Sequence, residues 1–425
     1  MDYRGVCYNG SMKIYISGIA GTGVGPLALL AKAAGHGVYG SDKNSGMILP
    51  ELDKAGIDVE IGNQDGSFLE RTFRETGVDW FVHTSALPEN HPEILKAKQL
   101  GIKISKRDEF LNYICKEENL WLVGVAGTHG KTTTTAMIVW TAIALKMPVA
   151  YLVGTTLGFA PTADYSKGDQ FLVLEADEYD RNFLAFNPEI AVIPTISYDH
   201  PDIYPTENDY NQAFEQFKSQ SKVILEPNGI DEGIELVGRA RKIDAGLALR
   251  ALEKMWELSK EEGEFPRDLA VQILNAFPGV GRRFERLIPG VYTDYAHHPE
   301  EIAATINLAE EEAAKRGLKG VVAVYEPHQN TRQHEVREGY KNAFEGVNRL
   351  FWLPTYLTRE DESLSVITPA EFIQDLEGGF EAEPAEAGDV LGERLCVLRD
   401  EGYLILLMTA GPADGWLRDE IRNWE

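Results

Sequence analysis

The chain has 425 residues, of which 44% are hydrophobic and 25% are charged, a balance that is typical of globular proteins. Asp and Glu number 67 against 41 Lys and Arg, and the net charge of −26 argues against a nucleic-acid-binding surface. No run of about 18 apolar residues occurs, so we expect no membrane span. The three widely separated cysteines indicate free thiols, and the N-terminus lacks a secretory signal, so we expect a cytoplasmic protein.

Short apolar runs alternate with longer helical patterns along the chain, which is typical of βαβ units and parallel sheets. The first part predicts helices near 25–37, 49–55 and 92–100, between strands over 13–17, 38–40, 80–84 and 103–105. The second part predicts a helix over 132–146, a helix-rich stretch over 231–276, and strands over 121–127, 171–177 and 189–197. The third part follows a break at 277–284 and predicts a helix over 299–317 and strands over 320–327, 350–353 and 403–409.

These three parts predict an α/β protein of three domains, with bounds at 1–118, 119–276 and 277–425. No internal repeat or low-complexity segment stands out in the sequence. Each domain is long enough to bury a core of its own.

A glycine-rich turn lies between the strand predicted over 121–127 and the next helix, and it reads GTHGKTT at 127–133. The backbone N–H groups of such a turn can surround phosphates, and the helix N-terminus adds the positive end of its dipole. Lys131 would then lie against the β- and γ-phosphates, and the Thr132 hydroxyl would hold Mg²⁺. The full G-x-x-x-x-G-K-S/T pattern fails at Val125, so a chance Gly-Lys-Thr turn is the alternative.

A second glycine-rich turn, Gly18–Gly23, also joins a predicted strand to a helix. It does not match G-x-G-x-x-G in register, but the same backbone arrangement can bind a diphosphate. Asp42 lies about where a carboxylate binds ribose in dinucleotide folds. The alternative is a tight turn that needs small residues only for packing.

Acidic residues follow the strand predicted over 171–177, in the run EADEYD at 175–180, and Asp199 and His200 follow the next strand. Ligands gather at the carboxyl ends of strands in α/β sheets, so Glu175 and His200 are candidates for a Mg²⁺ site. A solvated acidic loop is the alternative. In the third part, Asp294, Tyr295, His297 and His298 form one cluster, and Glu326, His328 and Arg332 form another.

Taken together, these motifs resemble the Mur ligase family, the ATP-dependent amide-forming enzymes of peptidoglycan precursor synthesis. The matching segments occur in the family's order: GIAGTG at 18–23, TSAL at 84–87, GTHGKTTTT at 127–135, EADE at 175–178, DH at 199–200, GVGRRFE at 279–285, DYAHHP at 294–299 and EPHQNTR at 326–332. The resemblance implies a Rossmann-like UDP-binding domain, a central P-loop ATPase-like domain and a Rossmann-like C-terminal domain. It also implies the ligation of L-alanine to UDP-N-acetylmuramate through an acyl phosphate, with ATP and Mg²⁺.

The resemblance also implies roles for individual residues. The UDP-sugar would contact Gly18, Gly21, Thr22, Gly23, Asp42, Thr84 and Ser85. The nucleotide would contact Gly127, Thr128, His129, Gly130, Lys131, Thr132 and Thr133, with Arg283 and Asp294 from the third domain. Mg²⁺ would be held by Thr132, Glu175 and His200. The amino acid would face Tyr295, His297 and Arg332, and the catalytic set would be Lys131, Glu175, His200, His297 and Arg332.

Several features leave alternatives open. EADEYD, DHPDIYP at 199–205 and the Asn330-Thr331 pair are similar to the family branch that attaches the tripeptide L-Ala-γ-D-Glu-meso-diaminopimelate. Gln329 stands where the L-alanine branch has Arg, and 241–245 replaces the family's Asn-rich adenine-contacting turn, which leaves the nucleotide preference open. A folylpolyglutamate-synthetase-like ligase and a non-catalytic nucleotide-binding protein are further alternatives. We expect no nucleic-acid or membrane partner, and either a monomer or a homodimer.

Overall fold

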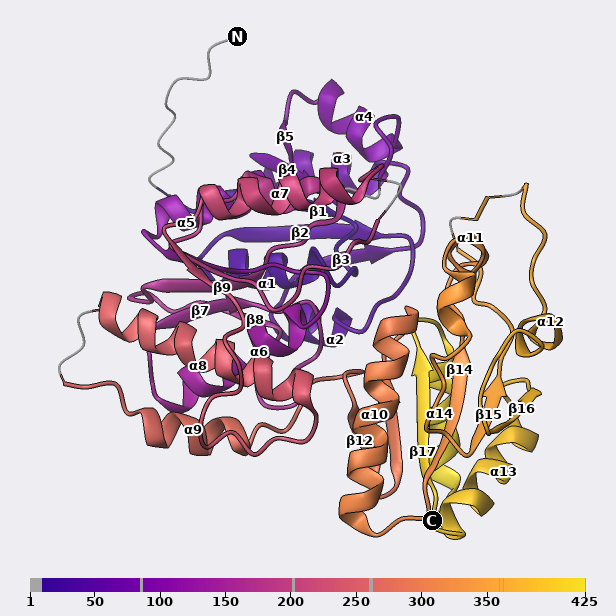
Figure 1. Cartoon of the computed structure of the whole chain (residues 1–425). Coiled ribbons are helices and arrows are strands. Elements are labelled where there is room, and N and C mark those ends of the chain that lie inside the picture. Colours follow the sequence, from indigo (N-terminus) through magenta and orange to yellow (C-terminus); the bar gives the residue numbers. More distant parts are fainter. Residues whose placement is uncertain are drawn as a thin grey trace. The chain divides into compact units, whose positions relative to one another are not determined.

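The computed structural model describes residues 10–84, 87–200, 203–259, 263–358, 360–361 and 363–424. The chain forms two compact units. The N-terminal unit is Met1–Ile234 with Ile243–Pro278, and the C-terminal unit is Glu235–Lys242 with Gly279–Glu425. Helices and strands alternate along the chain in both units (Figure 1). The strands form three sheets, and the predicted α/β class is confirmed.

The first sheet of the N-terminal unit is parallel, with the strand order β3-β2-β1-β4-β5. Its strands are β1 Lys13–Ser17, β2 Gly37–Asp42, β3 Asp58–Ile61, β4 Trp80–His83 and β5 Lys103–Lys106. Its helices are α1 Gly25–Ala33, α2 Leu49–Lys54, α3 Ser67–Thr76, α4 Pro92–Gln99 and α5 Arg107–Glu117. The strand order reverses at β1, and a parallel sheet opens a crevice for ligands at the carboxyl end of its strands at such a point. The turn that follows β1 lies at this end.

The second sheet has the order β11-β10-β6-β9-β7-β8, and β8 alone is antiparallel to its neighbour. Its strands are β6 Trp121–Val125, β7 Val149–Leu152, β8 Ala163–Asp164, β9 Phe171–Glu175, β10 Ile190–Val192 and β11 Val223–Leu225. The accompanying helices are α6 Lys131–Ala144, the 3-10 helix η1 Tyr179–Ala185, α7 Glu207–Ser219, α8 Arg239–Ser259 and α9 Arg267–Asn275. Because β10, β6 and β9 are adjacent and parallel, the segments after them begin side by side at one edge.

One hydrophobic core joins the two sheets of the N-terminal unit. It runs from Ile14 and Ile16 of β1 to Leu174 of β9 and Phe217 of α7. Polar contacts add to it, because the Thr162 amide and hydroxyl donate to Glu51 on α2 at 2.8 and 2.9 Å. This shared core explains why the two sheets form one unit. The domain bounds at 118 and 276 stay a prediction.

The sheet of the C-terminal unit has the order β12-β13-β17-β14-β15-β16, with β12 antiparallel to β13. Its strands are β12 Glu285–Ile288, β13 Val291–Asp294, β14 Val321–Glu326, β15 Arg349–Trp352, β16 Glu381–Pro384 and β17 Leu404–Thr409. Its helices are α10 Pro299–Arg316, α11 Asn330–Glu335, α12 Pro369–Ile373, α13 Asp389–Asp400 and α14 Ala413–Glu420, with η2 Arg337–Tyr340 and η3 Ile421–Asn423 as 3-10 helices.

Side chains of the C-terminal sheet alternate between its two faces, as the pleat requires. Ala323 and Tyr325 of β14 pack in the core that contains α10, whereas Val322 and Val324 pack in the core that contains α13 and α14. The helices therefore cover both faces of the sheet (Figure 1). No helix of the described segments has the length and apolar character that a bilayer crossing needs.

Candidate functional site

The loop predicted to bind phosphate lies between β6 and α6 and includes two positions that favour glycine. Gly127 has φ +149° and Gly130 has φ +85°, and residues that carry a Cβ rarely adopt such backbone angles. A Cβ on Gly130 would lie 2.9 Å from the Cβ of Pro194 and 2.7 Å from the Oδ1 of Asp244. The segment after β10 and the helix α8 thus fix the shape of the loop.

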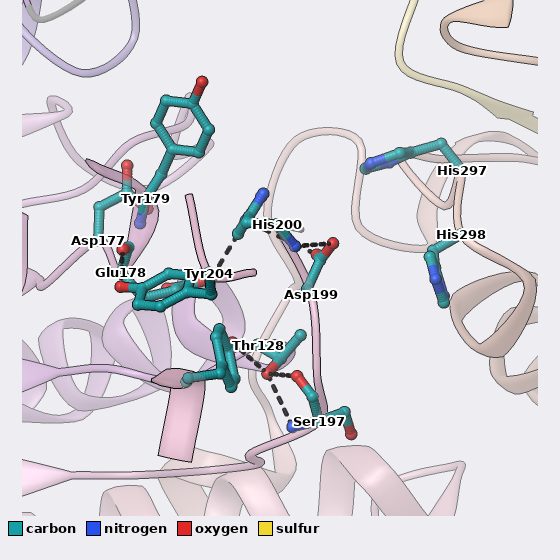
Figure 2. A network of polar contacts seen from close by, with 12 residues as sticks. Thr128, Asp177, Glu178, Tyr179, Ser197, Asp199, His200, Tyr204, His297 and His298 are labelled. Atoms are coloured by element: carbon teal, nitrogen blue, oxygen red, sulfur yellow. Dashed lines mark hydrogen bonds and ion pairs between the residues drawn. The ribbon is translucent and has the colours of Figure 1, made fainter. Parts of the chain in front are cut away.

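Thr128 uses both of its donors to hold this loop in place. Its N–H donates to the Thr195 carbonyl at 2.9 Å, and its hydroxyl donates to the Ser197 carbonyl at 2.7 Å. The same oxygen accepts from the Ser197 N–H at 2.9 Å (Figure 2). It also lies 2.7 Å from the Tyr210 hydroxyl. This structure therefore gives Thr128 a role in anchoring the loop, and its predicted contact with a nucleotide stays a prediction. His129 and Thr133 are partly buried.

Lys131, the first residue of α6, forms a buried ion pair with Glu178. Its Nζ lies 2.8 Å from both carboxylate oxygens of Glu178, and the Glu178 side chain is only 1% exposed. The Lys131 ammonium also donates to the Gly127 carbonyl at 2.6 Å. Burial alone lowers the pKa of Lys131, but the charges of Glu178 and Asp177 outweigh it and raise the pKa. Burial alone raises the pKa of Glu178, but the Lys131 charge opposes burial, and the net pKa lies below its usual value. Both groups are therefore charged.

Thr132 and Glu175, two of the predicted metal ligands, are in contact. The Thr132 hydroxyl donates to Glu175 Oε2 at 2.8 Å, and the Gly154 N–H donates to Glu175 Oε1 at 2.9 Å. Carboxylate and hydroxyl oxygens are the ligands that Mg²⁺ prefers, so this pair fits a magnesium ion. In the part of the chain that the structure describes, no group of three or more His, Cys, Asp or Glu is arranged to hold a metal.

His200, the third predicted metal ligand, approaches Glu178 rather than Glu175. Its Nε2 lies 3.7 Å from Glu178 Oε1 and 3.6 Å from Asp199 Oδ2, and the edge of its ring meets the Tyr179 ring (Figure 2). Burial lowers the pKa of His200, but the Glu178 carboxylate, which accepts from the ring, and the Asp199 charge raise the pKa above its usual value. The predicted convergence of the segments after β9 and β10 is thus observed, with Glu178 at its centre.

The first glycine-rich turn, after β1, is shaped by contacts with Thr84 and Asp42. Gly18 has φ +86°, and a Cβ there would lie 2.7 Å from the Cγ2 of Thr84. Asp42 Oδ2 accepts the Ala20 N–H at 2.9 Å, so this carboxylate holds the turn. The part of the turn that faces solvent consists of Gly21, Thr22 and Gly23. The predicted contact through Ser85 lies outside the described residues.

A buried carboxylate that the sequence analysis missed lies near this turn. Glu93 on α4 is 1% exposed and accepts hydrogen bonds from the hydroxyls of Tyr15 and Ser41 at 2.7 Å, and from Ser17. Ser17 ends β1 and Ser41 lies in β2, so the network ties together the strand ends from which the turn and Asp42 emerge. Sequence spacing gives no signal for this network, because its residues come from three separate elements, β1, β2 and α4.

In the C-terminal unit, Asp294 ends β13 and holds two backbone segments. Its oxygens accept the Phe284 N–H at 2.6 Å and the Ala296 N–H at 2.7 Å. Burial raises the pKa of this carboxyl, against the opposing charge of Arg283. The Arg283 guanidinium lies over the Tyr295 ring, 5.2 Å from its centroid. Asp294, Arg283 and Tyr295 therefore lie close together, and their predicted contacts with the nucleotide and the amino acid stay predictions.

His297 is held by the start of α10, and Arg332 lies on α11. The His297 Nδ1 is 3.0 Å from the Tyr295 carbonyl and 3.3 Å from Glu301, and its ring packs against the His328 ring. Burial lowers the pKa of His297, the Glu301 charge opposes this, and the Arg332 charge adds to it. The net pKa lies below the usual value, so the imidazole is neutral at neutral pH.

Glycine-rich turns thus follow the central strands of two sheets, with buried charges beside one of them, as in α/β proteins that bind ligands at strand ends. The family models "Mur ligase family, catalytic domain" and "Mur ligase middle domain" match residues 13–119 and 125–232. A UDP-N-acetylmuramate–L-alanine ligase of Lactobacillus delbrueckii subsp. bulgaricus is 30% identical over 389 residues, which cover 81% of this chain and 84% of the relative. The chain belongs to the Mur ligase family.

Two solved structures share the fold over nearly the whole chain. UDP-N-acetylmuramate-alanine ligase MurC from Thermotoga maritima is 22% identical, with a TM-score of 0.74, and 97% of this chain and 99% of that chain are covered. Murein peptide ligase mpl from Psychrobacter arcticus is 21% identical, with a TM-score of 0.63 and the same coverage of both chains. These likenesses confirm the fold.

We expect Gly130→Ala to destabilise the protein more than Gly23→Ala. Gly130 has φ +85° and close neighbours, whereas a Cβ on Gly23 would meet no heavy atom within 4 Å. The strained backbone at residue 130 should lower the free energy of unfolding by about 1–3 kcal/mol. Urea denaturation of both variants measures this, and equal stabilities would contradict the loop geometry.

We expect the His297 ring to titrate below pH 6.5, because burial disfavours its charged form. The unfolded chain then binds a proton that the folded chain does not, so the free energy of unfolding falls as the pH drops below about 6.5. An NMR titration of the ring protons, assigned with a His297→Gln variant, measures the value. A pKa at or above the usual one would show that the ring is not held neutral.

Proposed function

We propose that the protein ligates L-alanine to UDP-N-acetylmuramate at the expense of ATP, in peptidoglycan precursor synthesis. The observation that carries the proposal is the contact of the GTHGKT loop with the acidic segment after β9, through Lys131 and Glu178 and through Thr132 and Glu175. The relatives named for this reaction, and membership of the Mur ligase family, support it. On this proposal the first sheet binds the UDP-sugar and the second binds ATP.

The chemistry needs an activated carboxyl group, because a carboxylate is a poor electrophile in water. The sugar's carboxylate attacks the γ-phosphorus of ATP, the bond to ADP breaks, and an acyl phosphate forms. The amine of L-alanine then attacks the acyl carbon, the oxyanion collapses, phosphate leaves, and the amine loses its proton. On this proposal the Lys131 ammonium would balance charge during phosphoryl transfer.

A magnesium ion would be held by Thr132 and Glu175, whose oxygens already face each other. Mg²⁺ commonly takes one or two carboxylates and completes its coordination with phosphates and water, which suits this small set of protein ligands. When bound, the ion would neutralise charge on the phosphates. We assign His200 to positioning, because Glu178 and Asp199 favour its protonated form.

For the acceptor, we assign the amino-acid contacts to the C-terminal unit, with His297, Tyr295 and Arg332. Asn330, one reason to consider a peptide acceptor, is 1% exposed. Its Nδ2 donates to the Ser365 carbonyl at 3.1 Å, and its Oδ1 accepts the Ile367 N–H at 3.0 Å. The Asn330 side chain therefore holds the loop around Ser365 and Ile367. That observation weakens the case for the tripeptide. The tripeptide stays the second candidate, because EADEYD and DHPDIYP are similar to that branch and Gln329 departs from the L-alanine branch.

The remaining expectations belong to this proposal. The three domains would bind UDP-sugar, ATP and amino acid in turn, with Arg283 and Asp294 also reaching the nucleotide. We place the enzyme in the cytoplasm, with no nucleic-acid or membrane partner. A monomer and a homodimer are both compatible with the sequence.

Replacing Lys131 by Ala should abolish ligation, with a loss of turnover well beyond the factor of ten that about 1.4 kcal/mol represents. It also leaves the Glu178 charge buried without its partner, so the free energy of unfolding should fall by about 3–5 kcal/mol. Phosphate release at 10 °C measures turnover, and UDP-N-acetylmuramate binding checks that the variant is folded. Lys116→Ala, at an exposed position on α5, is the control. Turnover above a tenth of wild type would contradict the ATP assignment.

The acceptor is tested by kcat/KM for L-alanine against the tripeptide L-Ala-γ-D-Glu-meso-diaminopimelate. We expect L-alanine to be preferred, with Arg332 pairing with its carboxylate. A Gln329→Arg variant should raise kcat/KM for L-alanine further, because a second guanidinium adds a charge-assisted bond. A preference for the tripeptide of more than tenfold in the unmodified enzyme would establish the second candidate.

A further inference from the structure

In the structure every donor of the Lys131 ammonium has a protein acceptor. An ammonium has three N–H groups. They face the Glu178 carboxylate at 2.8 Å, the Gly127 carbonyl at 2.6 Å and the Thr128 carbonyl at 3.4 Å. A phosphate can therefore accept a hydrogen bond from Lys131 only by displacing or sharing one of these protein acceptors. The two carbonyls are neutral, so the acceptor that competes most strongly with a phosphate for the ammonium is the charged Glu178 carboxylate.

Glu178 is held in the position where its carboxylate competes most strongly with phosphates for the Lys131 ammonium. Its backbone carbonyl accepts the Tyr204 hydroxyl at 2.6 Å and the Arg181 N–H at 3.1 Å, which holds the segment after β9. At 1% exposure its carboxylate has almost no water to screen it. Asp180 follows two residues later with φ +53°, and its carboxylate pairs with Lys106 at 2.9 Å. Glu178 therefore cannot move far from Lys131 without disturbing this segment.

We propose that Glu178 is an internal counter-ion that competes with nucleotide phosphates for Lys131 and so weakens nucleotide binding to the empty loop. This inference rests on the proposed function, since it needs a nucleotide at residues 127–133. Phosphates arriving at Lys131 meet a buried negative charge at hydrogen-bond distance from the same ammonium. Removing that charge leaves Lys131 free to pair with the phosphates alone.

The test is ADP binding by isothermal titration calorimetry in EDTA, so that no metal contributes. Glu178→Gln keeps the shape of the side chain and removes its charge, and we expect it to bind ADP about fivefold to tenfold more tightly than wild type. Asp180→Asn is the matched control, because it removes one negative charge from the same segment but at a residue paired with Lys106. We expect no comparable gain for it.

A gain confined to Glu178→Gln supports the inference, whereas unchanged or weaker ADP binding overturns it. An equal gain in Asp180→Asn also overturns it, since only the general charge would then matter. If Glu178→Gln does not fold, Glu178→Asp replaces it, because the shorter side chain draws the carboxylate back from Lys131 and should tighten binding about twofold. Wild-type protein that binds no ADP, with or without Mg²⁺, would instead contradict the proposed function.

Discussion

The buried ion pair between Lys131 and Glu178 is the interaction on which the arrangement of the second sheet's carboxyl edge depends. A charge with almost no access to water is tolerated only when a partner lies beside it. Lys131 comes from the helix after β6 and Glu178 from the segment after β9, so the pair joins two strand ends. His200, in the segment after β10, also approaches Glu178 and so brings a third strand end to this ion pair. Removing either charge would therefore leave the other one buried without its partner.

Several carboxylates predicted to contact ligands also hold the backbone in this structure. Asp42 accepts an N–H from the first glycine-rich turn, Glu175 accepts the Gly154 N–H, and Asp294 accepts two N–H groups. Each carboxylate lies at a strand end, where backbone amides turn away from the sheet and need acceptors. The same residue type thus serves loop geometry and ligand chemistry, and sequence position alone does not separate the two roles.

The α/β class and the main elements could be predicted from the sequence, because buried parallel strands give continuous apolar runs. Four strands of the first sheet and helix α6 lie within a few residues of the prediction. The exposed strand β3 and the helices α3 and α7 are among the elements that were missed. Strand β3 carries Asp58 and Glu60 and has no buried residue, so no apolar run marks it. Contacts such as that of Thr128 with Tyr210 on α7 join residues far apart in sequence, and no local pattern reveals them.

The predicted catalytic set included Glu175 but omitted Glu178, and the reason is geometric. In the run from Glu175 to Asp180 four residues are acids, and the sequence does not say which one faces the phosphate loop. The chain turns after β9, so that Glu178 meets Lys131 while Asp180 meets Lys106. The site therefore holds more negative than positive charge before any substrate arrives. On the proposed function, this local excess means that a divalent cation should strengthen nucleotide binding, because Lys131 alone offsets only part of the charge of its own carboxylate and the incoming phosphates.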